Sequence, residues 1–185
     1  MFDTVLIAGL GLMGGSMAKT IKARTLSRVL GWNRTRATAE QALADGSIDA
    51  IATEALYKEA DLVIIGLYPQ ATVDWLLENM SKMKKGCVIV DMVGVKQFMV
   101  DHLEQAALDA GVHYVGGHPM AGREFSGLDF ALSTLFDGAS MIFVPTKSST
   151  ERVLEQLEAY FMSLGFGQTV RCTAQQHDHM IAFTS

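Results

Sequence analysis

The sequence predicts an α/β fold in which helices cover both faces of a doubly wound, mostly parallel sheet. Three observations support this prediction. Short apolar runs alternate with helical patterns along the whole chain. The runs Leu62–Leu67 and Gly86–Asp91 are almost continuously apolar, as expected of strands buried on both faces. A glycine-rich turn follows the first apolar run and opens a helical pattern.

The first half of the chain contains the elements around that turn. The run Val5–Ala8 predicts the first strand, and the helix after the turn is expected to end near Lys22. Thr35 is an expected N-cap of a helix that runs to about Ala44, and Pro69 is expected to open the next helix. The other strands predicted here are Val29–Trp32, Ile48–Ala52 and Leu62–Leu67.

The second half continues the alternation of strands and helices. A helix over Lys96–Ala110 is expected to end at Gly111, and Thr150 is expected to cap a helix that runs to Leu164. A turn is expected at Gly117–Gly122. The strands predicted here are Gly86–Asp91, Val112–Gly116, Met141–Val144 and Gly167–Arg171, and a new helix begins at Ala174.

Composition limits the function classes. The chain has 185 residues, 49% of them apolar, and a net charge of −5, so we expect one domain with an appendage and some apolar surface for a partner. The acidic balance argues against nucleic acid as a ligand. Cys87 and Cys172 show no paired spacing, and they are expected to be buried thiols in a reducing compartment. No secretory pattern or bilayer-length apolar run is visible, so we expect a cytoplasmic protein without membrane contact.

The glycine-rich turn has the G-x-G-x-x-G pattern of a Rossmann-type dinucleotide-binding unit. In such units the first glycine makes the turn, the second lets the backbone approach a pyrophosphate, and the third lets the helix pack closely on the strand. The anion then lies at the positive end of the helix dipole. The alternative is a glycine-rich turn that binds nothing. The predicted cofactor-binding residues of the turn are Gly9, Leu10, Gly11, Leu12, Met13 and Gly14.

The end of the second strand bears on the choice of cofactor. NAD-binding units usually have an acidic residue there, about twenty residues past the glycines. Here the residues are Asn33, Arg34 and Thr35, and Arg34 could pair with the 2′-phosphate of NADP while Asn33 and Thr35 hydrogen-bond it. We therefore expect NADP, with NAD as the alternative. The alternative without a binding role is that Arg34 is a solvated arginine beside a helix cap.

Further loops are expected at the same edge of the sheet, because parallel strands end together. They add Leu67, Tyr68, Pro69 and Gly94 to the predicted cofactor-binding residues.

His118 is the candidate catalytic residue. It follows two glycines and precedes a proline, so the imidazole should project from a strand end into the crevice, where it could accept a hydroxyl proton. The alternative is a half-exposed turn histidine. Glu124 is either a solvated loop acid or a salt-bridge partner that closes the site. His177 and His179 are two residues apart on a predicted helix and share no face, so no metal site is expected.

The two turns together resemble the prephenate and arogenate dehydrogenase family of tyrosine biosynthesis. The most specific part is Gly116–Gly127, GGHPMAGREFSG, and the run His177–Ser185 resembles the start of the family's second domain. The resemblance implies an oxidative decarboxylation with NAD(P): hydride leaves the ring carbon that bears the hydroxyl, carbon dioxide departs, and the ring becomes aromatic. His118 matches the family's catalytic histidine, with Gly94 and Glu124 expected near the substrate, prephenate or arogenate.

The resemblance also implies a domain division. We expect residues 1–172 to form the dinucleotide-binding domain and residues 173–185 to be the first helix of a truncated helical domain, which makes family members homodimers. The chain alone should then bind dinucleotide and turn over poorly. One residue departs from the family's Asp-x-x-Ser-x-Lys loop: over Asp91–Lys96, Gly94 stands in place of the serine that assists the histidine.

Two other functions remain open from the sequence. One is an NADP-dependent 3-hydroxyacid dehydrogenase, which shares the glycine turn but needs a catalytic lysine on a later helical domain. The other is a non-catalytic module that binds a dinucleotide or a partner.

Overall fold

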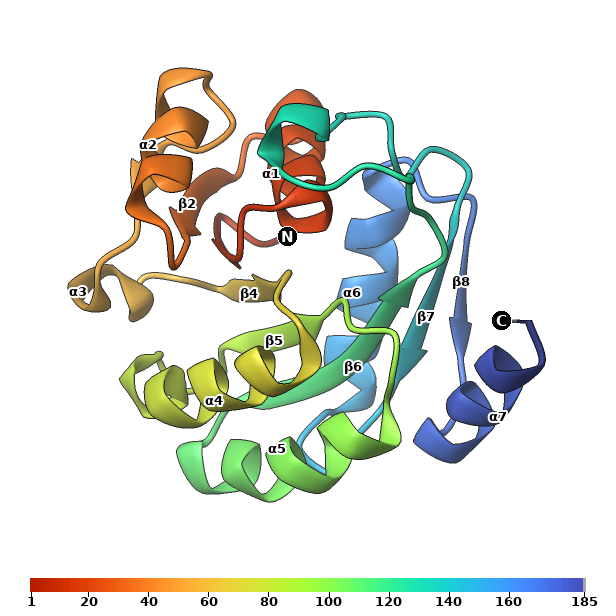
Figure 1. Cartoon of the computed structure of the whole chain (residues 1–185). Helices are drawn as coiled ribbons and strands as arrows, with labels where there is room; N and C mark the ends of the chain where they lie inside the picture. Colours follow the sequence, from red (N-terminus) through yellow and green to blue (C-terminus); the bar gives the residue numbers. More distant parts are fainter. Residues whose placement is uncertain (185) are drawn as a thin grey trace.

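The structure is a computed structural model and describes residues 1–184. The strands of this part of the chain form one sheet (Figure 1). Its strand order is β3-β2-β1-β4-β5-β6-β7-β8, and neighbouring strands are parallel except for the antiparallel pair β6 and β7. The predicted doubly wound, mostly parallel sheet is thus confirmed. The strands are β1 Thr4–Ala8, β2 Arg28–Trp32, β3 Ala50–Ile51, β4 Leu62–Ile65, β5 Val88–Asp91, β6 His113–Pro119, β7 Ser140–Val144 and β8 Gln168–Arg171.

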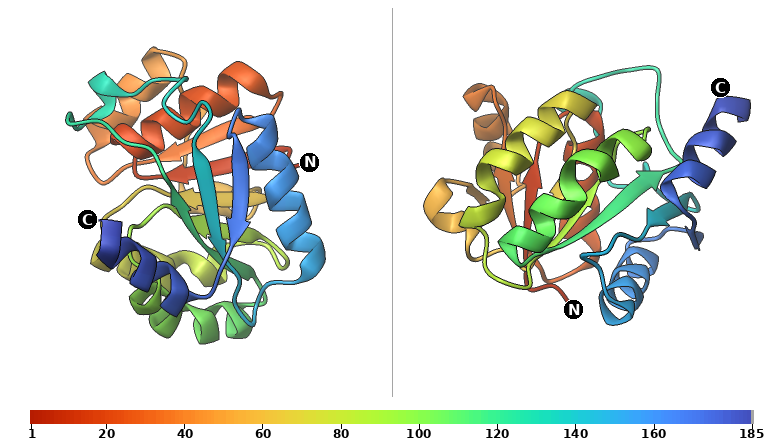
Figure 2. Two further views of the ribbon diagram at one scale, coloured as in Figure 1. Left: turned by 90° about the vertical axis from the view of Figure 1, so that its right-hand side faces the viewer. Right: turned by 90° about the horizontal axis from the view of Figure 1, so that it is seen from below.

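Helices cover both faces of this sheet. One core cluster joins α1, α2 and α6 to the strands, and a second cluster joins α3, α4 and α5 to the opposite face. Figure 2 shows α4 and α5 in front of the strands in its right-hand view. The helices are α1 Leu12–Arg24, α2 Arg36–Ala44, α3 Glu54–Tyr57, α4 Pro69–Asn79, α5 Gln97–Ala110, α6 Glu151–Ser163 and α7 Ala174–Thr184, with short 3-10 helices at Met80–Lys82 and Leu128–Phe130.

The apolar strands bury both of their faces. In β1, Val5 and Ile7 belong to one cluster, and Leu6 and Ala8 belong to the other. Successive side chains of a strand point to opposite faces, so a strand covered on both sides has to be apolar throughout. Each fully buried aliphatic side chain of this size stabilises the fold by about 1.5–3 kcal/mol. The sheet is therefore a rigid base for the loops at its edge.

The predicted caps are largely confirmed. The Thr150 hydroxyl accepts a hydrogen bond from the N–H of Val153, and Pro69 occupies the first turn of α4. Gly111 ends α5 with a φ of 70°, a conformation that favours glycine. Thr35 occupies the N-cap position of α2, but its side chain makes no capping hydrogen bond.

Some predicted boundaries were wrong. The turn expected at Gly117–Gly122 begins as strand, because β7 pairs antiparallel with Gly116–Pro119 and extends β6. The strand predicted at Ile48–Ala52 pairs only over Ala50–Ile51, and the short helix α3 was not predicted. Cys87 is buried as expected, but Cys172 is only partly buried.

The predicted carboxyl-terminal helix is confirmed as α7, and Ser185 lies outside the described residues. The helix packs against α5, and His177 on it is fully buried. The division of the chain after residue 172 stays a prediction. No helix within residues 1–184 is long and apolar enough to cross a membrane.

Candidate functional site

The three glycines of the first turn lie in three different environments. Gly9 has a φ of 93°, and a Cβ on it would lie 2.6 Å from the carbonyl oxygen of Gly66. A Cβ on Gly14 would overlap the carbonyl oxygen of Gly9. A Cβ on Gly11 would have no atom within 4 Å. These are the environments expected of a turn, a close helix–strand contact and an open approach for a ligand.

Hydrogen bonds tie this turn to the neighbouring strand ends. The N–H of Gly9 donates to the carbonyl oxygen of Trp32 at 2.8 Å. The N–H of Leu10 donates to Oδ1 of Asn33 at 2.9 Å. The helix α1 that follows has no acidic residue in its first turn, and its Gly11 N-cap has no side chain to occupy the first N–H groups. The turn therefore offers a fixed and open cradle for an anion such as a pyrophosphate.

The three residues after β2 differ in how far they are already engaged. Arg34 is exposed and makes no hydrogen bond or ion pair within residues 1–184. Thr35 is exposed as well. Asn33 is held at both ends of its amide, because Nδ2 donates to the carbonyl oxygen of Thr35 at 3.0 Å while Oδ1 accepts from Leu10. Asn33 thus has a positioning role in the turn, whereas Arg34 is a cation at this edge with no partner among residues 1–184.

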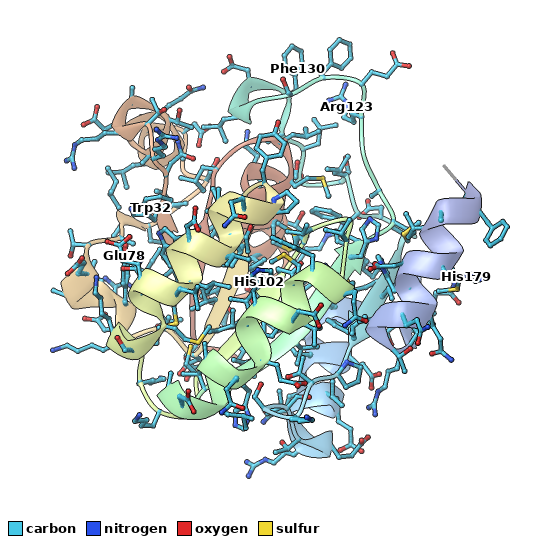
Figure 3. The ribbon with its side chains drawn as sticks, turned by 60° about the horizontal axis from the view of Figure 1, so that its bottom comes forward. Trp32, Glu78, His102, Arg123, Phe130 and His179 are labelled. Carbon is cyan, nitrogen blue, oxygen red and sulfur yellow. The ribbon has the colours of Figure 1, made fainter. Side chains whose placement is uncertain are left out.

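The remaining predicted residues lie on loops at the carboxyl ends of β4, β5 and β6. Leu67 and Pro69 are partly buried, while Tyr68 is 85% exposed. Glu124 is exposed and makes no ion pair with any residue of the described part of the chain. Figure 3 shows Arg123 and Phe130 on the segment between β6 and β7 that contains Glu124, well apart from His179 on α7. The structure does not bring Glu124 into contact with the other predicted residues.

His118 lies near the end of β6 and is half-buried. It pairs in register with Ile142 of β7. One edge of the ring faces the loop after β5, since a Cβ on Gly94 would lie 3.8 Å from Nε2. On the other edge, Nδ1 lies 2.7 Å from Nε2 of His177. The structure therefore brings His118 and Gly94 together as predicted, and it adds His177.

Sequence reasoning missed His177 as part of this site. It is fully buried on α7, and its Nδ1 lies 2.8 Å from Oδ1 of Asp178. The Asp178 carboxylate accepts the N–H groups of Lys96 and Gln97 at 2.8 and 2.9 Å, at the start of α5. An adjacent His-Asp pair on a helix was the available signal, but its contact with His118 is long-range.

A buried ion pair lies beside this cluster. Nζ of Lys96 lies 2.5 Å from Oδ1 of Asp91, and neither side chain is exposed. Lys96 also donates to the carbonyl oxygen of Val93 at 2.5 Å, and the Tyr114 hydroxyl donates to Oδ2 of Asp91 at 2.7 Å. Burial raises the pKa of Tyr114 well above its usual value, and the neighbouring Asp91 carboxylate raises it further. The pair thus anchors the loop that contains Gly94.

The pKa of His118 is lowered to about 4. Burial is the largest cause, and the neighbouring His177 and Lys96 also lower it, while Asp91 and Asp178 oppose them. The ring is therefore neutral at pH 7, so one of its nitrogens carries a lone pair that can accept a proton.

Two surface hollows lie away from this edge. One of about 390 Å³ is lined by residues at the amino ends of the strands, among them Asp61 and His113. Another of about 330 Å³ is lined by Val100, Val144 and Cys172. The glycine turn, Arg34 and His118 therefore belong to an open edge of the sheet rather than to either hollow.

Comparisons with known proteins agree on a family. Residues 17–168 match the family model described as the prephenate dehydrogenase nucleotide-binding domain. Prephenate dehydrogenase of Bacillus subtilis is 34% identical over 189 residues, which cover 100% of this chain and 50% of that protein. The chain therefore spans about half the length of this relative.

Two solved structures have the same fold over nearly the whole chain. Synechocystis arogenate dehydrogenase superposes with a TM-score of 0.89 at 26% identity, over 98% of this chain and 64% of that one. Prephenate dehydrogenase of Aquifex aeolicus, in complex with hydroxyphenyl propionate and NAD⁺, superposes with a TM-score of 0.86 at 25% identity, over 97% of this chain and 63% of that one.

Proposed function

The chain belongs to the prephenate dehydrogenase family, in its nucleotide-binding domain, and we propose that it takes part in the NAD(P)-dependent oxidative decarboxylation of prephenate or arogenate. One observation carries the proposal. A neutral histidine, His118, lies at the same sheet edge as the glycine cradle and turns Nε2 toward the loop at Gly94. A base beside a dinucleotide site is the arrangement that oxidation of an alcohol needs.

The cofactor site of the proposal is the cradle Gly9–Gly14. The open backbone at Gly11 and the first turn of α1 would hold the pyrophosphate. When bound, an oxidised nicotinamide dinucleotide accepts the hydride from the substrate. We propose NADP rather than NAD, because the free cation Arg34 can pair with a 2′-phosphate and no carboxylate stands at Asn33 to repel it.

His118 has the role of base in this proposal. Its Nε2 accepts the proton of the ring hydroxyl. Hydride leaves the ring carbon that bears this hydroxyl, and the oxygen becomes carbonyl-like. Loss of carbon dioxide then supplies the electron pair that makes the ring aromatic, and the phenolate oxygen so formed takes up a proton to give the product hydroxyl. The product is 4-hydroxyphenylpyruvate from prephenate, or tyrosine from arogenate. A neutral imidazole suits this step, because a cationic ring has no lone pair to accept the proton.

The remaining parts of the proposal concern the substrate and the assembly. Gly94, which lies by His118, and the exposed Glu124 are the other residues of this chain proposed to lie near the substrate. The relatives extend well beyond the length of this chain, so we propose that further residues complete the substrate site. A homodimer is part of the same proposal, since the family resemblance implies dimerisation, and a cytoplasmic location is proposed from the sequence pattern alone.

The test is an assay of the natural protein with prephenate and with arogenate, using NADP⁺ and NAD⁺ in turn. We expect reduced dinucleotide together with 4-hydroxyphenylpyruvate or tyrosine. His118→Gln should lower kcat about 10²- to 10⁴-fold, the usual contribution of a positioned base. Oxidation of 3-hydroxy acids with no turnover of either cyclohexadienyl substrate would contradict the proposal and favour the 3-hydroxyacid dehydrogenase alternative.

A further inference from the structure

We propose that His177 is a positioning residue that fixes which ring nitrogen of His118 is free to act as the base. The inference rests on the proposed function of His118, and it assigns a role to α7 in the site. It follows from a chain of side-chain contacts that runs from β6 through α7 to the first turn of α5.

The first step concerns the carboxylate at the end of this chain. Asp178 accepts two backbone N–H groups at the start of α5, from Lys96 and Gln97, and it also contacts Nδ1 of His177. Burial alone would raise the pKa of Asp178, but these hydrogen bonds outweigh burial and lower it. Asp178 is therefore an ionised carboxylate that can only accept hydrogen bonds.

The second step assigns the protons of the two rings. Because the Asp178 carboxylate accepts, Nδ1 of His177 is the donor. A neutral His177 then carries its lone pair on Nε2, which lies 2.7 Å from Nδ1 of His118. Toward a neutral His177, His118 must therefore donate from Nδ1. The lone pair of a neutral His118 is left on Nε2, the nitrogen that faces Gly94.

The third step explains why a neutral His177 excludes the other tautomer of His118. With a proton on Nε2 instead, His118 would point a second lone pair from Nδ1 at the lone pair of His177. With a proton on both of the facing nitrogens, Nδ1 of His118 and Nε2 of His177, two N–H donors would face each other. The titratable groups that face His118 are His177 and Asp178 from α7, Lys96 from the start of α5, and Asp91 from β5. The two carboxylates are already held by hydrogen bonds to other groups.

The consequence is that α7 contributes to the base even though it is remote in sequence. His118 and His177 are separated by 59 residues. Without the acceptor on His177, the His118 ring could turn about its side-chain bond and exchange tautomers, and the base would spend only part of its time with a lone pair on Nε2. A wrongly held tautomer of a catalytic histidine is costly, up to about 10⁴-fold in kcat in the serine proteases.

Histidine ¹⁵N NMR of the 185-residue chain at neutral pH tests the tautomer directly. We expect His118 to show a protonated, pyrrole-type Nδ1 and a lone-pair, pyridine-type Nε2, with His177 likewise protonated on Nδ1. His177→Leu should give His118 averaged shifts. His179→Leu is the matched control, because His179 is exposed on the same helix and its ring makes an edge-to-face contact with Phe183. A pyrrole-type Nε2 on wild-type His118 would overturn the inference, whether or not the protein is an active enzyme.

Kinetics of the natural protein provide the second test. His177→Leu should lower kcat about 10²-fold with KM changed less than about threefold, because the base is misplaced while the binding groups remain. His177→Gln should recover most of that loss, since its Oε1 can accept from Nδ1 of His118, and His179→Leu should behave as wild type. Equal kcat for wild type and His177→Leu would also overturn the inference. Absence of turnover in the wild type, with the expected tautomer present, would refute the proposed function instead.

Discussion

The two ends of the candidate site are built in different ways. The glycine cradle is a continuous stretch of six residues, Gly9–Gly14, and backbone contacts determine its shape. The base is held by side chains from β6, α7 and the start of α5, and His118 and His177 are separated by 59 residues. The residues of the cradle are therefore contiguous in sequence and depend on the absence of side chains at its glycines, although Trp32 and Asn33 hold the turn in place. The base depends on the tertiary structure around it.

Within the cradle, Gly14 is the position where a substitution should destabilise the protein most. Gly14→Val should cost about 4 kcal/mol or more of unfolding free energy, because its Cβ would overlap the carbonyl oxygen of Gly9 and the helix would have to move off the strand. Urea unfolding followed by circular dichroism measures the loss. Gly11→Ala is the control and should cost about 1 kcal/mol or less, since the position is an open N-cap with a φ of −75°. Equal losses in the two variants would contradict the assigned contacts.

At the other end, the buried pair of Lys96 and Asp91 offers the next largest effect. Lys96→Met should cost about 3–5 kcal/mol, because it leaves the Asp91 carboxylate buried without its cation. The double variant Lys96→Met, Asp91→Leu should recover much of that loss, since no unpaired charge remains. The same urea unfolding applies. A single variant as stable as the wild type would show that the loop at Gly94 does not depend on this pair.

The pH dependence of stability sharpens the comparison further. The folded-state pKa of His118, about 4, lies below its ordinary value of 6.5, so the unfolded chain binds the proton more tightly. The contribution of the neutral His118 ring to the free energy of unfolding is fully present above pH 6.5. It is lost as the pH falls toward 4. We expect a contribution of about 1–2 kcal/mol, since the ring is only half-buried and solvent screens it.

Unfolding curves of wild type and His118→Gln across this pH range measure that contribution. The wild type should lose more stability than the variant on acidification, while variants of the glycine cradle should keep the wild-type slope. Parallel curves for wild type and His118→Gln would mean that His118 titrates normally in the folded chain.

The smallest expected effect is at Gly94, the residue of the loop after β5 that lies next to the His118 ring. Gly94→Ser should raise kcat of the natural protein by about threefold, equivalent to less than about 1 kcal/mol, because its Cβ would lie 3.8 Å from Nε2 of His118 and its hydroxyl could hydrogen-bond near the reacting oxygen. Gly94→Ala is the matched control and should not increase kcat. If alanine gave the same increase as serine, the hydroxyl would not be responsible.

The sequence predicted the elements that depend on local chemistry. The alternation of strands and helices, the three glycine positions, Pro69 at the start of α4 and Thr150 as a cap all follow from neighbouring residues. The prediction that His118 and Gly94 lie at one edge of the sheet followed from the common edge of parallel strands, whereas their close approach comes from the structure.

What the sequence did not predict depends on contacts between distant residues. Helix α5 has no cap of its own, and Asp178 from α7 supplies the acceptor for its first N–H groups. The extension of β6 through His118 required the antiparallel strand β7. On its own helix His177 shares no face with His179, and the residue that His177 contacts, His118, lies on another element.

The central claim is that the glycine cradle and Arg34 form one working NADP site. Calorimetric titration of the chain with NADP⁺ and with NAD⁺ tests it, on the wild type and on Gly11→Val, Arg34→Ala and Asn33→Asp. We expect tighter binding of NADP⁺, loss of both nucleotides in Gly11→Val, and a selective loss of NADP⁺ in Arg34→Ala. Asn33→Asp keeps the oxygen that holds Leu10 but adds a charge, so it should shift the preference toward NAD⁺. Equal affinities for both nucleotides in all four proteins, or no binding to a folded wild type, would contradict the account.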